Sequence, residues 1–156
     1  MKKDRYQSKV VVFLVLTRKV NENTEILLQK RKNTGYMDNM YDMACSGHLE
    51  KGESLSQAII REAKEEIGIE IQEKDLKMIA LIHPYQEDYL NIFFEVNKYD
   101  GIPEIKEKNK CSDLDWFDIN KLPENTITRI RNVLENIKNG IIYDDGDFSN
   151  QKLQNR

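Results

Sequence analysis

The sequence has 156 residues, with 24 lysines and arginines against 27 aspartates and glutamates, for a formal charge of −3. This length suits one domain with its own core, and 39% hydrophobic with 33% charged residues excludes a disordered chain. The longest apolar run, residues 10–16, is far shorter than the roughly 18 residues that cross a bilayer, and no secretory leader is recognisable. The balanced charge also argues against binding duplex DNA through a basic surface. We therefore expect a cytoplasmic protein without a membrane segment.

The first half of the chain predicts two paired strands. Residues 9–16 are apolar and mostly β-branched, which is typical of a central strand buried on both faces. After a polar turn, residues 24–30 predict an antiparallel partner. Residues 33–42 lack a clear period and contain Gly35, so we expect a loop there. Cys45 and Cys111 match no disulfide or metal-ligand spacing, and we expect reduced thiols.

The strongest helix signal covers residues 54–67. Ser54 and Gln57 form a capping-box pattern, and Gly68 follows the last apolar residue, where a left-handed C-cap is favoured. A second helix is predicted between Pro123 and Gly140, with apolar residues at helical spacing. Further strands are predicted at residues 77–83, 89–96 and 113–117.

This order of elements predicts a mixed sheet with helices on both faces, an α/β/α sandwich. We expect residues 1–143 to form the catalytic domain and residues 144–156 to form a polar, mobile tail.

Three glutamates share one face of the first helix. Glu62, Glu65 and Glu66 stand at i, i+3 and i+4, so their carboxylates repel one another. A hard divalent cation would compensate this charge, and carboxylates without histidine or cysteine point to Mg²⁺ or Mn²⁺ rather than Zn²⁺. The alternative is a solvated helix face balanced by Arg61 and Lys64. Nearby glycines favour the metal site, since they leave backbone groups free beside the acids.

The segment that contains these glutamates resembles the signature of the Nudix hydrolase family, G-x5-E-x7-R-E-U-x-E-E-x-G-U, where U is a bulky apolar residue. The matching residues are Gly47, Glu53, Arg61, Glu62, Glu65, Glu66, Gly68 and Ile69. Only Ala63, at the first U position, is small. The resemblance covers residues of about 8 to 140. It implies a Nudix-like fold and a Mg²⁺-dependent hydrolase of a pyrophosphate linkage in a nucleoside diphosphate joined to another group.

The resemblance also implies roles for individual residues. Glu62, Glu65 and Glu66 would be metal ligands together with the backbone carbonyl of Gly47. Glu62 would in addition orient or deprotonate the attacking water, and we place Glu62, Glu65 and Arg61 in the catalytic group.

Supporting roles follow for two further positions of the signature. Arg61 would pair with the glutamates and hold their rotamers, while Glu53 would brace the loop against the helix.

Several residues outside the signature complete the expected site. Glu107 is our candidate for a further metal ligand, because similar proteins take a glutamate from the loop before the strand that contains Trp116; Glu104 and Glu95 compete with it. For substrate binding we expect Arg31, at the end of the second strand, to contact phosphate. Ser46 adds a hydroxyl near the substrate, at a position where family members often have glycine. His48 and His83 are weak candidates for acid–base chemistry.

The leading hypothesis is a pyrophosphohydrolase of nucleoside triphosphates, including oxidised ones. The alternatives are another diphosphate substrate (a nucleotide sugar, a dinucleotide polyphosphate, a capped RNA end or an isoprenoid diphosphate) or a nucleotide sensor without catalysis. The intact glutamate set argues against the sensor. A homodimer is compatible with this kind of domain.

Overall fold

Strand β1 (Lys9–Val20) is the centre of the sheet in the computed structural model, which describes residues 3–145. The other described elements are β2 (Asn23–Arg31), β3 (Tyr41–Met43), β4 (Cys45–His48), α1 (Leu55–Ile67), β5 (Lys77–Ile82), β6 (Tyr89–Val96), β7 (Cys111–Asp118), α2 (Thr128–Lys138) and β8 (Tyr143–Asp144), with short 3₁₀ turns η1 (Glu73–Asp75) and η2 (Tyr85–Glu87).

The sheet is mixed, as the sequence predicts. One edge of β1 pairs in parallel with β6 along residues 9–16, and the other edge pairs antiparallel with β4 and then with β2. The strand order is β3-β2-β1-β6-β5-β8, with β4 attached to β1 and β7 attached to β2.

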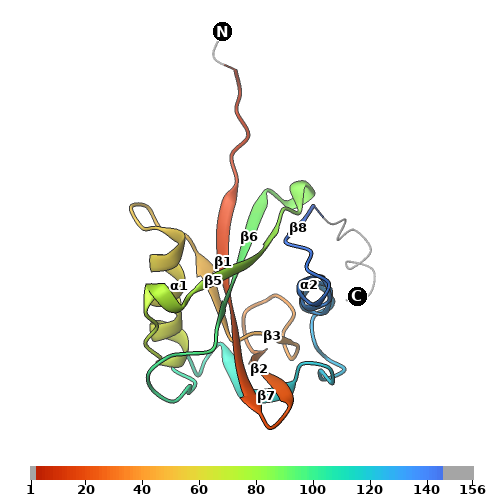
Figure 1. Ribbon diagram of the computed structural model, residues 1–156. Coiled ribbons are helices and arrows are strands. Elements are labelled where there is room, and N and C mark those ends of the chain that lie inside the picture. The colour runs from red at the N-terminus through yellow and green to blue at the C-terminus, as the bar shows by residue number, and fades with distance from the viewer. Residues whose placement is uncertain (1–2, 146–156) are drawn as a thin grey trace.

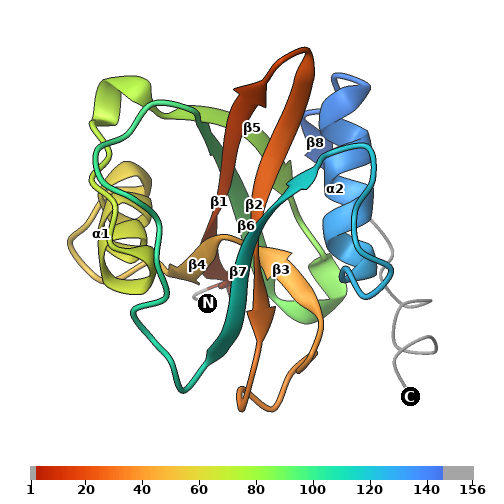
Figure 2. The same cartoon turned by 90° about the horizontal axis from the view of Figure 1, so that it is seen from below.

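Side chains of β1 alternate between two hydrophobic cores. Val12 and Leu14 pack in the core beneath α1, whereas Val11, Phe13 and Val15 pack in the core beneath α2. Successive residues of a strand point to opposite faces, so one apolar run supplies both cores. Figures 1 and 2 show the two helices on opposite sides of the strands. The predicted α/β/α sandwich is therefore confirmed.

Helix α1 begins and ends as its sequence predicts. The hydroxyl of Ser54 accepts from the backbone N–H of Gln57 at 3.1 Å, and the Gln57 side chain accepts from the Ser54 N–H at 2.8 Å. Gly68 ends the helix in the left-handed region, with φ of 72°. Ala58, Ile59, Ala63 and Ile67 form its buried face.

The structure corrects several predicted boundaries: β1 continues to Val20 rather than ending at residue 16, and β7 covers Cys111–Asp118 rather than residues 113–117. Tyr41 and Asp42 belong to β3 rather than to a loop, and β4 follows after Ala44; both strands are too short to show a period. Asp144, which the sequence places in the tail, belongs to β8 and pairs with Ile82 of β5. The rest of the predicted mobile tail, residues 146–156, lies outside the described residues. No helix within residues 3–145 combines the length and hydropathy that a membrane span requires.

Candidate active site

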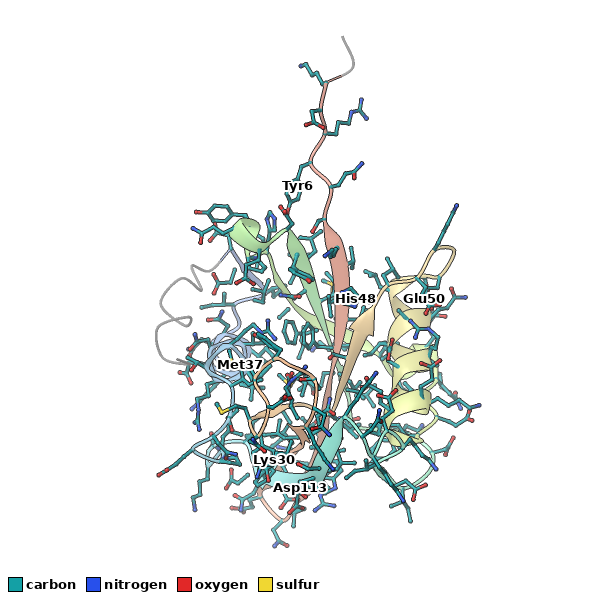
Figure 3. The ribbon with its side chains drawn as sticks, turned by 180° about the vertical axis from the view of Figure 1, so that it is seen from behind. Tyr6, Lys30, Met37, His48, Glu50 and Asp113 are labelled. Carbon is teal, nitrogen blue, oxygen red and sulfur yellow. The ribbon has the colours of Figure 1, made fainter. Side chains whose placement is uncertain are left out.

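Strand β4 separates two groups of functional side chains. Ser46 and His48 line a pocket on the α2 side of the sheet, whereas Cys45 is buried in the core beneath α1 and Gly47 contacts a glutamate of that helix. This arrangement follows from the alternation of side chains along a strand. Figure 3 shows His48 and Glu50 beside the place where β4 leads into α1.

Gly47 leaves the space that the Glu62 carboxylate occupies. A Cβ at Gly47 would lie 1.9 Å from Oε1 of Glu62, so only a residue without a side chain permits this placement. The Glu62 side chain is 12% exposed. Burial raises the pKa of Glu62, the contact with Arg61 opposes this rise, and the negative charges of Glu65 and Glu107 add to it.

Glu66 joins α1 to β4. Its Oε2 accepts a hydrogen bond from the backbone N–H of Ser46 at 3.1 Å, and no cation forms an ion pair with it among residues 3–145. Burial raises the pKa of Glu66 to about 8; the Ser46 N–H opposes this rise, and the charges of Glu62 and Glu107 add to it. Without a cation the buried Glu66 carboxyl therefore favours its protonated form near neutral pH, and a cation bound beside it would favour the charged form.

Arg61 connects the signature loop to the helix. Its Nε and Nη2 donate to the two oxygens of Glu53 at 3.0 and 2.8 Å, and Nη2 also donates to the carbonyl of His48 at 3.2 Å. Nη1 contacts Glu62 at 2.7 Å and Glu65 at 3.4 Å. The paired Glu53 raises the pKa of Arg61 and is itself held below its ordinary pKa by it. Arg61 is therefore permanently charged.

Glu53 braces the turn before α1, as the sequence predicts. Its Oε1 accepts from the backbone N–H of Glu50 at 2.7 Å while the same carboxylate holds Arg61. The loop and the helix are linked through this one side chain.

Glu107 lies near the glutamates because its loop packs on the end of α1. The backbone N–H of Lys106 donates to the Glu66 carbonyl, and the N–H of Glu104 donates to the Ile67 carbonyl, both at 3.0 Å. The charge of Glu107 acts on Glu62 and on Glu66. Its Oε1 lies 4.0 Å from Lys110, and its side chain is 38% exposed.

The two competing glutamates have other surroundings. Glu104 forms an ion pair with Lys106. Glu95 borders a separate cavity with Val15 and Leu134 on the α2 side of the sheet, across from the signature glutamates. Of the three candidates, Glu107 is the one whose charge acts on the cluster.

The predicted ligands share one region without forming a ready-made coordination shell. Within residues 3–145, no group of three or more histidine, cysteine, aspartate or glutamate side chains is arranged to hold a metal ion. The physical reason is that Glu62 and Glu65 point to Arg61, while Glu66 points to the Ser46 N–H. The side-chain donors are nevertheless all carboxylate oxygens, and three glutamates share one guanidinium or lack an ion pair among the described residues, which fits a hard divalent cation such as Mg²⁺.

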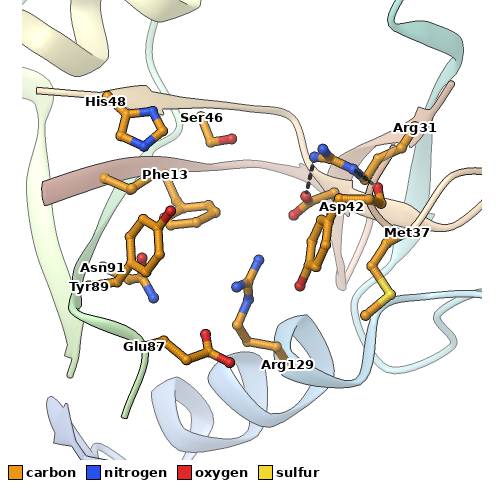
Figure 4. Close-up of a pocket in the computed structure, with 12 residues that line it drawn as sticks. Phe13, Arg31, Met37, Asp42, Ser46, His48, Glu87, Tyr89, Asn91 and Arg129 are labelled. Carbon is orange, nitrogen blue, oxygen red and sulfur yellow. Dashed lines mark hydrogen bonds and ion pairs between the residues drawn. The ribbon is translucent and has the colours of Figure 1, made fainter. Parts of the chain in front are cut away.

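The pocket on the other side of β4 has a volume of about 290 Å³ (Figure 4). Apolar and aromatic side chains from β1, β6 and the segment before β3 form its walls. Its polar lining comes from Arg31, Asp42, Ser46, His48, Glu87, Asn91 and Arg129. A concave site with aromatic walls and a few polar groups is typical of small-molecule binding.

Arg31 lines this pocket, but its guanidinium already has protein partners. Nη1 lies 3.0 Å from Asp42, Nε donates to the carbonyl of Tyr36 at 2.8 Å, and Nη2 donates to Thr34 at 3.1 Å. Arg31 therefore holds the segment before β3 against the sheet, a contact that the sequence did not predict.

The sequence missed four polar residues of the pocket, namely Asp42, Glu87, Asn91 and Arg129. Asp42 and Asn91 are 1% and 3% exposed. A polar residue within an apolar strand, as Asn91 is in β6, is a signal that would have indicated a pocket. The two histidines named as weak candidates for acid–base chemistry lie in different places. His48 lines the pocket, whereas Nε2 of His83 lies 3.2 Å from the hydroxyl of Tyr6.

Comparison with known proteins identifies the class to which this fold and site belong. The model of the NUDIX domain matches residues 7–137, and the chain therefore belongs to the Nudix family. It is an enzyme of the Nudix pyrophosphohydrolase type.

Two relatives and one solved structure illustrate the similarity. An 8-oxo-dGTP diphosphatase of Escherichia coli K12 is 33% identical over 88 residues, which are 56% of this chain and 67% of the relative. An NAD-capped RNA hydrolase of Chromobacterium violaceum is 30% identical over 105 residues, 67% of this chain but 37% of the longer relative. The crystal structure of a MutT NUDIX hydrolase from Burkholderia pseudomallei superposes with a TM-score of 0.70 at 22% identity, covering 83% of this chain and 97% of that one.

Proposed function

We propose that the protein is a Mg²⁺-dependent hydrolase that cleaves a pyrophosphate linkage in nucleoside diphosphate derivatives, with nucleoside triphosphates as its main substrates. Mn²⁺ is the alternative cofactor. The observation that carries this proposal is the position of β4, whose one face contacts the glutamates of α1 while its other face lines the pocket. A nucleotide in the pocket would have its phosphates beside the acidic cluster.

In this proposal Glu62, Glu65 and Glu66, the carbonyl of Gly47 and the carboxylate of Glu107 hold Mg²⁺. Bound Mg²⁺ would supply charge for the phosphate oxygens and lower the pKa of a water. Glu62 would orient or deprotonate the attacking water. The Arg61 guanidinium would fix the rotamers of Glu62 and Glu65, which it contacts at 2.7 and 3.4 Å.

The pocket supports a nucleoside as the other part of the substrate. Phe13, Tyr36 and Tyr89 offer aromatic surface, and aromatic rings stack on bases of any sequence. Ser46 lines the pocket, while its backbone N–H donates to Glu66 on the other side of β4. Arg31 would contact phosphate through N–H groups of Nη1 and Nη2 that its hydrogen bonds to Asp42 and Thr34 do not use.

The named activities of relatives support this order of substrates. The similarity to an 8-oxo-dGTP diphosphatase favours nucleoside triphosphates, oxidised ones included. The similarity to NAD-capped RNA hydrolases keeps capped RNA ends as an alternative, beside nucleotide sugars, dinucleotide polyphosphates and isoprenoid diphosphates. A sensor without catalysis would be the outcome if nucleotides bound without turnover.

A substrate panel tests the proposal. The protein is incubated with each class of diphosphate in Mg²⁺, in Mn²⁺ and in EDTA, and phosphate and pyrophosphate release are measured. We expect metal-dependent pyrophosphate release from nucleoside triphosphates, with Glu65→Gln as the inactive control. If no diphosphate were hydrolysed with either metal, the proposal would be wrong.

A cytoplasmic location and a homodimer complete the proposal. Light scattering on the purified protein tests the dimer, because it measures the molar mass of the particle in solution.

A further inference from the structure

Arg129 is a charged residue in the wall of the pocket that has no polar partner within residues 3–145. It lies in the first turn of α2, and its Nε is buried with no hydrogen-bond partner. None of the hydrogen bonds or ion pairs among the described residues involves its guanidinium. A buried donor that stays unpaired costs free energy, because it has lost its water and gained nothing in return.

The aromatic side chains of the pocket hold this guanidinium in place. Its Cζ lies 5.6 Å from the ring centre of Phe13 and 5.9 Å from that of Tyr36. Contacts between a cation and two rings fix the position of the planar group, yet they use none of its N–H bonds. Figure 4 shows Arg129 extending from α2 toward the pocket that Ser46 and Asn91 also border.

Asn91 is a second polar residue in the wall of this pocket. It is 3% exposed, and its side chain makes no hydrogen bond within residues 3–145. Its backbone lies opposite Val11, on the strand face that points to α2. The buried, unpaired Nε of Arg129 and the polar side chain of Asn91 line one pocket, where a ligand can supply partners to both.

The position of Arg129 separates it from the phosphates of the proposed substrate. The glutamates project from α1, whereas Arg129 projects from α2, on the other side of the strands. A nucleotide whose phosphates lie beside the glutamates would extend its base toward α2, where Arg129 lines the pocket. An arginine offers donors only, in a planar fork that matches two adjacent acceptors.

We propose that Arg129 selects a 6-oxopurine base, guanine or hypoxanthine, over adenine and the pyrimidines. The proposal rests on the proposed function, because it assumes a nucleotide in this pocket. Guanine presents O6 and N7, two acceptors that an arginine fork binds together. Adenine has an amino donor in place of O6, which faces the donors of the fork, and pyrimidines offer a single acceptor or a donor on the corresponding edge.

Binding of non-hydrolysable nucleotides tests this selection. The α,β-methylene triphosphates of guanosine, inosine, adenosine and uridine are titrated calorimetrically in Mg²⁺. We expect the guanosine and inosine analogues to bind at least about 10-fold more tightly than the other two. Equal affinity for the guanosine and adenosine analogues would overturn the proposal.

Three variants separate base recognition from charge and from structure. Arg129→Met keeps the apolar stem between the rings, and we expect its guanosine preference to fall below about 3-fold. Arg129→Lys keeps the charge without the fork and should lose most of the preference too. Lys138→Met removes a charge from an exposed position of the same helix and should keep the preference in full. A uniform loss of affinity for all four nucleotides in Arg129→Met would make Arg129 a phosphate contact and overturn the proposal.

Thermal stability provides an independent readout. Because Arg129 has no polar partner among the described residues, the ligand-free Met variant should melt at or above the temperature of the wild type. A large fall in its melting temperature would mean that Arg129 is kept for the fold and would contradict the proposal.

Turnover distinguishes this inference from the proposed function. Hydrolysis of all four natural triphosphates with equal kcat/KM would overturn the base selection alone. Selective binding of the guanosine analogue without hydrolysis of GTP or of any other diphosphate would support the selection and overturn the proposed function.

Discussion

Arg61 and Glu53 are joined by two parallel hydrogen bonds, of 3.0 and 2.8 Å, across eight residues of the chain. The two side chains are only 23% and 15% exposed, so this pair is screened less than a surface ion pair. It ties the turn before α1 to the face of the helix that carries the glutamates.

Arg61→Ala should therefore lower both stability and turnover. We expect a loss of about 2 kcal/mol in the metal-free protein, because Glu62 loses its cation while its side chain stays 12% exposed. The loss should shrink in saturating Mg²⁺, and urea denaturation with EDTA or with Mg²⁺ measures both values. Lys64→Ala is the matched control, since Lys64 is 67% exposed in its ion pair with Glu70. An equal loss with and without Mg²⁺ would make Arg61 a packing residue.

Gly47→Ala should abolish activity and leave the fold intact. The new Cβ would meet the end of the Glu62 side chain, which can move aside, while the backbone of Gly47 does not have a positive φ. We expect a fall in kcat of at least about 100-fold with a melting temperature within a few degrees of the wild type. Circular dichroism and turnover assays check the two halves of the statement.

Gly52→Ala is the control for this substitution. Gly52 has φ of 90°, and a Cβ added there would meet no atom within 4 Å, so alanine strains the backbone without touching a carboxylate. A stability loss of about 1 kcal/mol is expected. If Gly47→Ala kept full turnover, the placement of Glu62 would not matter for the reaction.

Glu66→Gln should stabilise the metal-free protein at high pH. The pKa of Glu66 is raised from its ordinary value of 4.5 to about 8, so its folded state favours the protonated form. The contribution of Glu66 is fully present below about pH 4.5 and is lost as pH rises through about 8. In EDTA at pH 9 the variant should be more stable than the wild type by up to about 5 kcal/mol, and the difference should vanish near pH 4.

Mg²⁺ should reverse this order at pH 9, because the cation compensates the carboxylate of the wild type and the amide of the variant offers no charge. Glu65→Gln is the comparison, since its side chain is 57% exposed and its replacement should change the stability of the metal-free protein little at pH 9. Both variants should lose most turnover. A wild-type protein that kept the same stability from pH 5 to 9 in EDTA would contradict the raised pKa of Glu66.

Arg31→Ala should loosen the segment before β3. The guanidinium holds Asp42, Thr34 and the Tyr36 carbonyl, and Asp42 would lose its cation while 1% exposed. We expect a stability loss of about 2 kcal/mol and a higher KM. If Arg31 also contacts phosphate, triphosphates should lose more affinity than the corresponding nucleosides; equal losses would leave it a purely structural role.

Much of the fold was predictable because its strongest signals are local. The ends of α1 depend on Ser54, Gln57 and Gly68, which act within one helical turn, and the apolar run that starts β1 is long enough to exclude other structures. Strands β3, β4 and β8 are two to four residues long, and only pairing with distant strands defines them.

The glutamate cluster and the pocket also differed in how far the sequence could predict them. The glutamates of α1 lie on one face through helix geometry alone, so Glu62, Glu65 and Glu66 could be grouped from their spacing. Asn91 and Arg129 line the same pocket only because β6 and α2 lie next to each other in the folded protein, and no local sequence pattern predicts this arrangement. The partners of Arg31 were unpredictable for the same reason, since they depend on how the chain folds back between β2 and β3.

The alternation of β1 between two cores makes the enzyme one cooperative unit. If either helix detached, every second side chain of β1 would become exposed to water. Unfolding of one helix should therefore destabilise the strand on which the other helix packs. Amide protons of residues 11–16 should accordingly exchange with deuterium only when the whole molecule unfolds. Protection in α1 and in α2 should then vanish at the same concentration of denaturant, which leaves no partly unfolded form with an intact pocket and a melted glutamate helix.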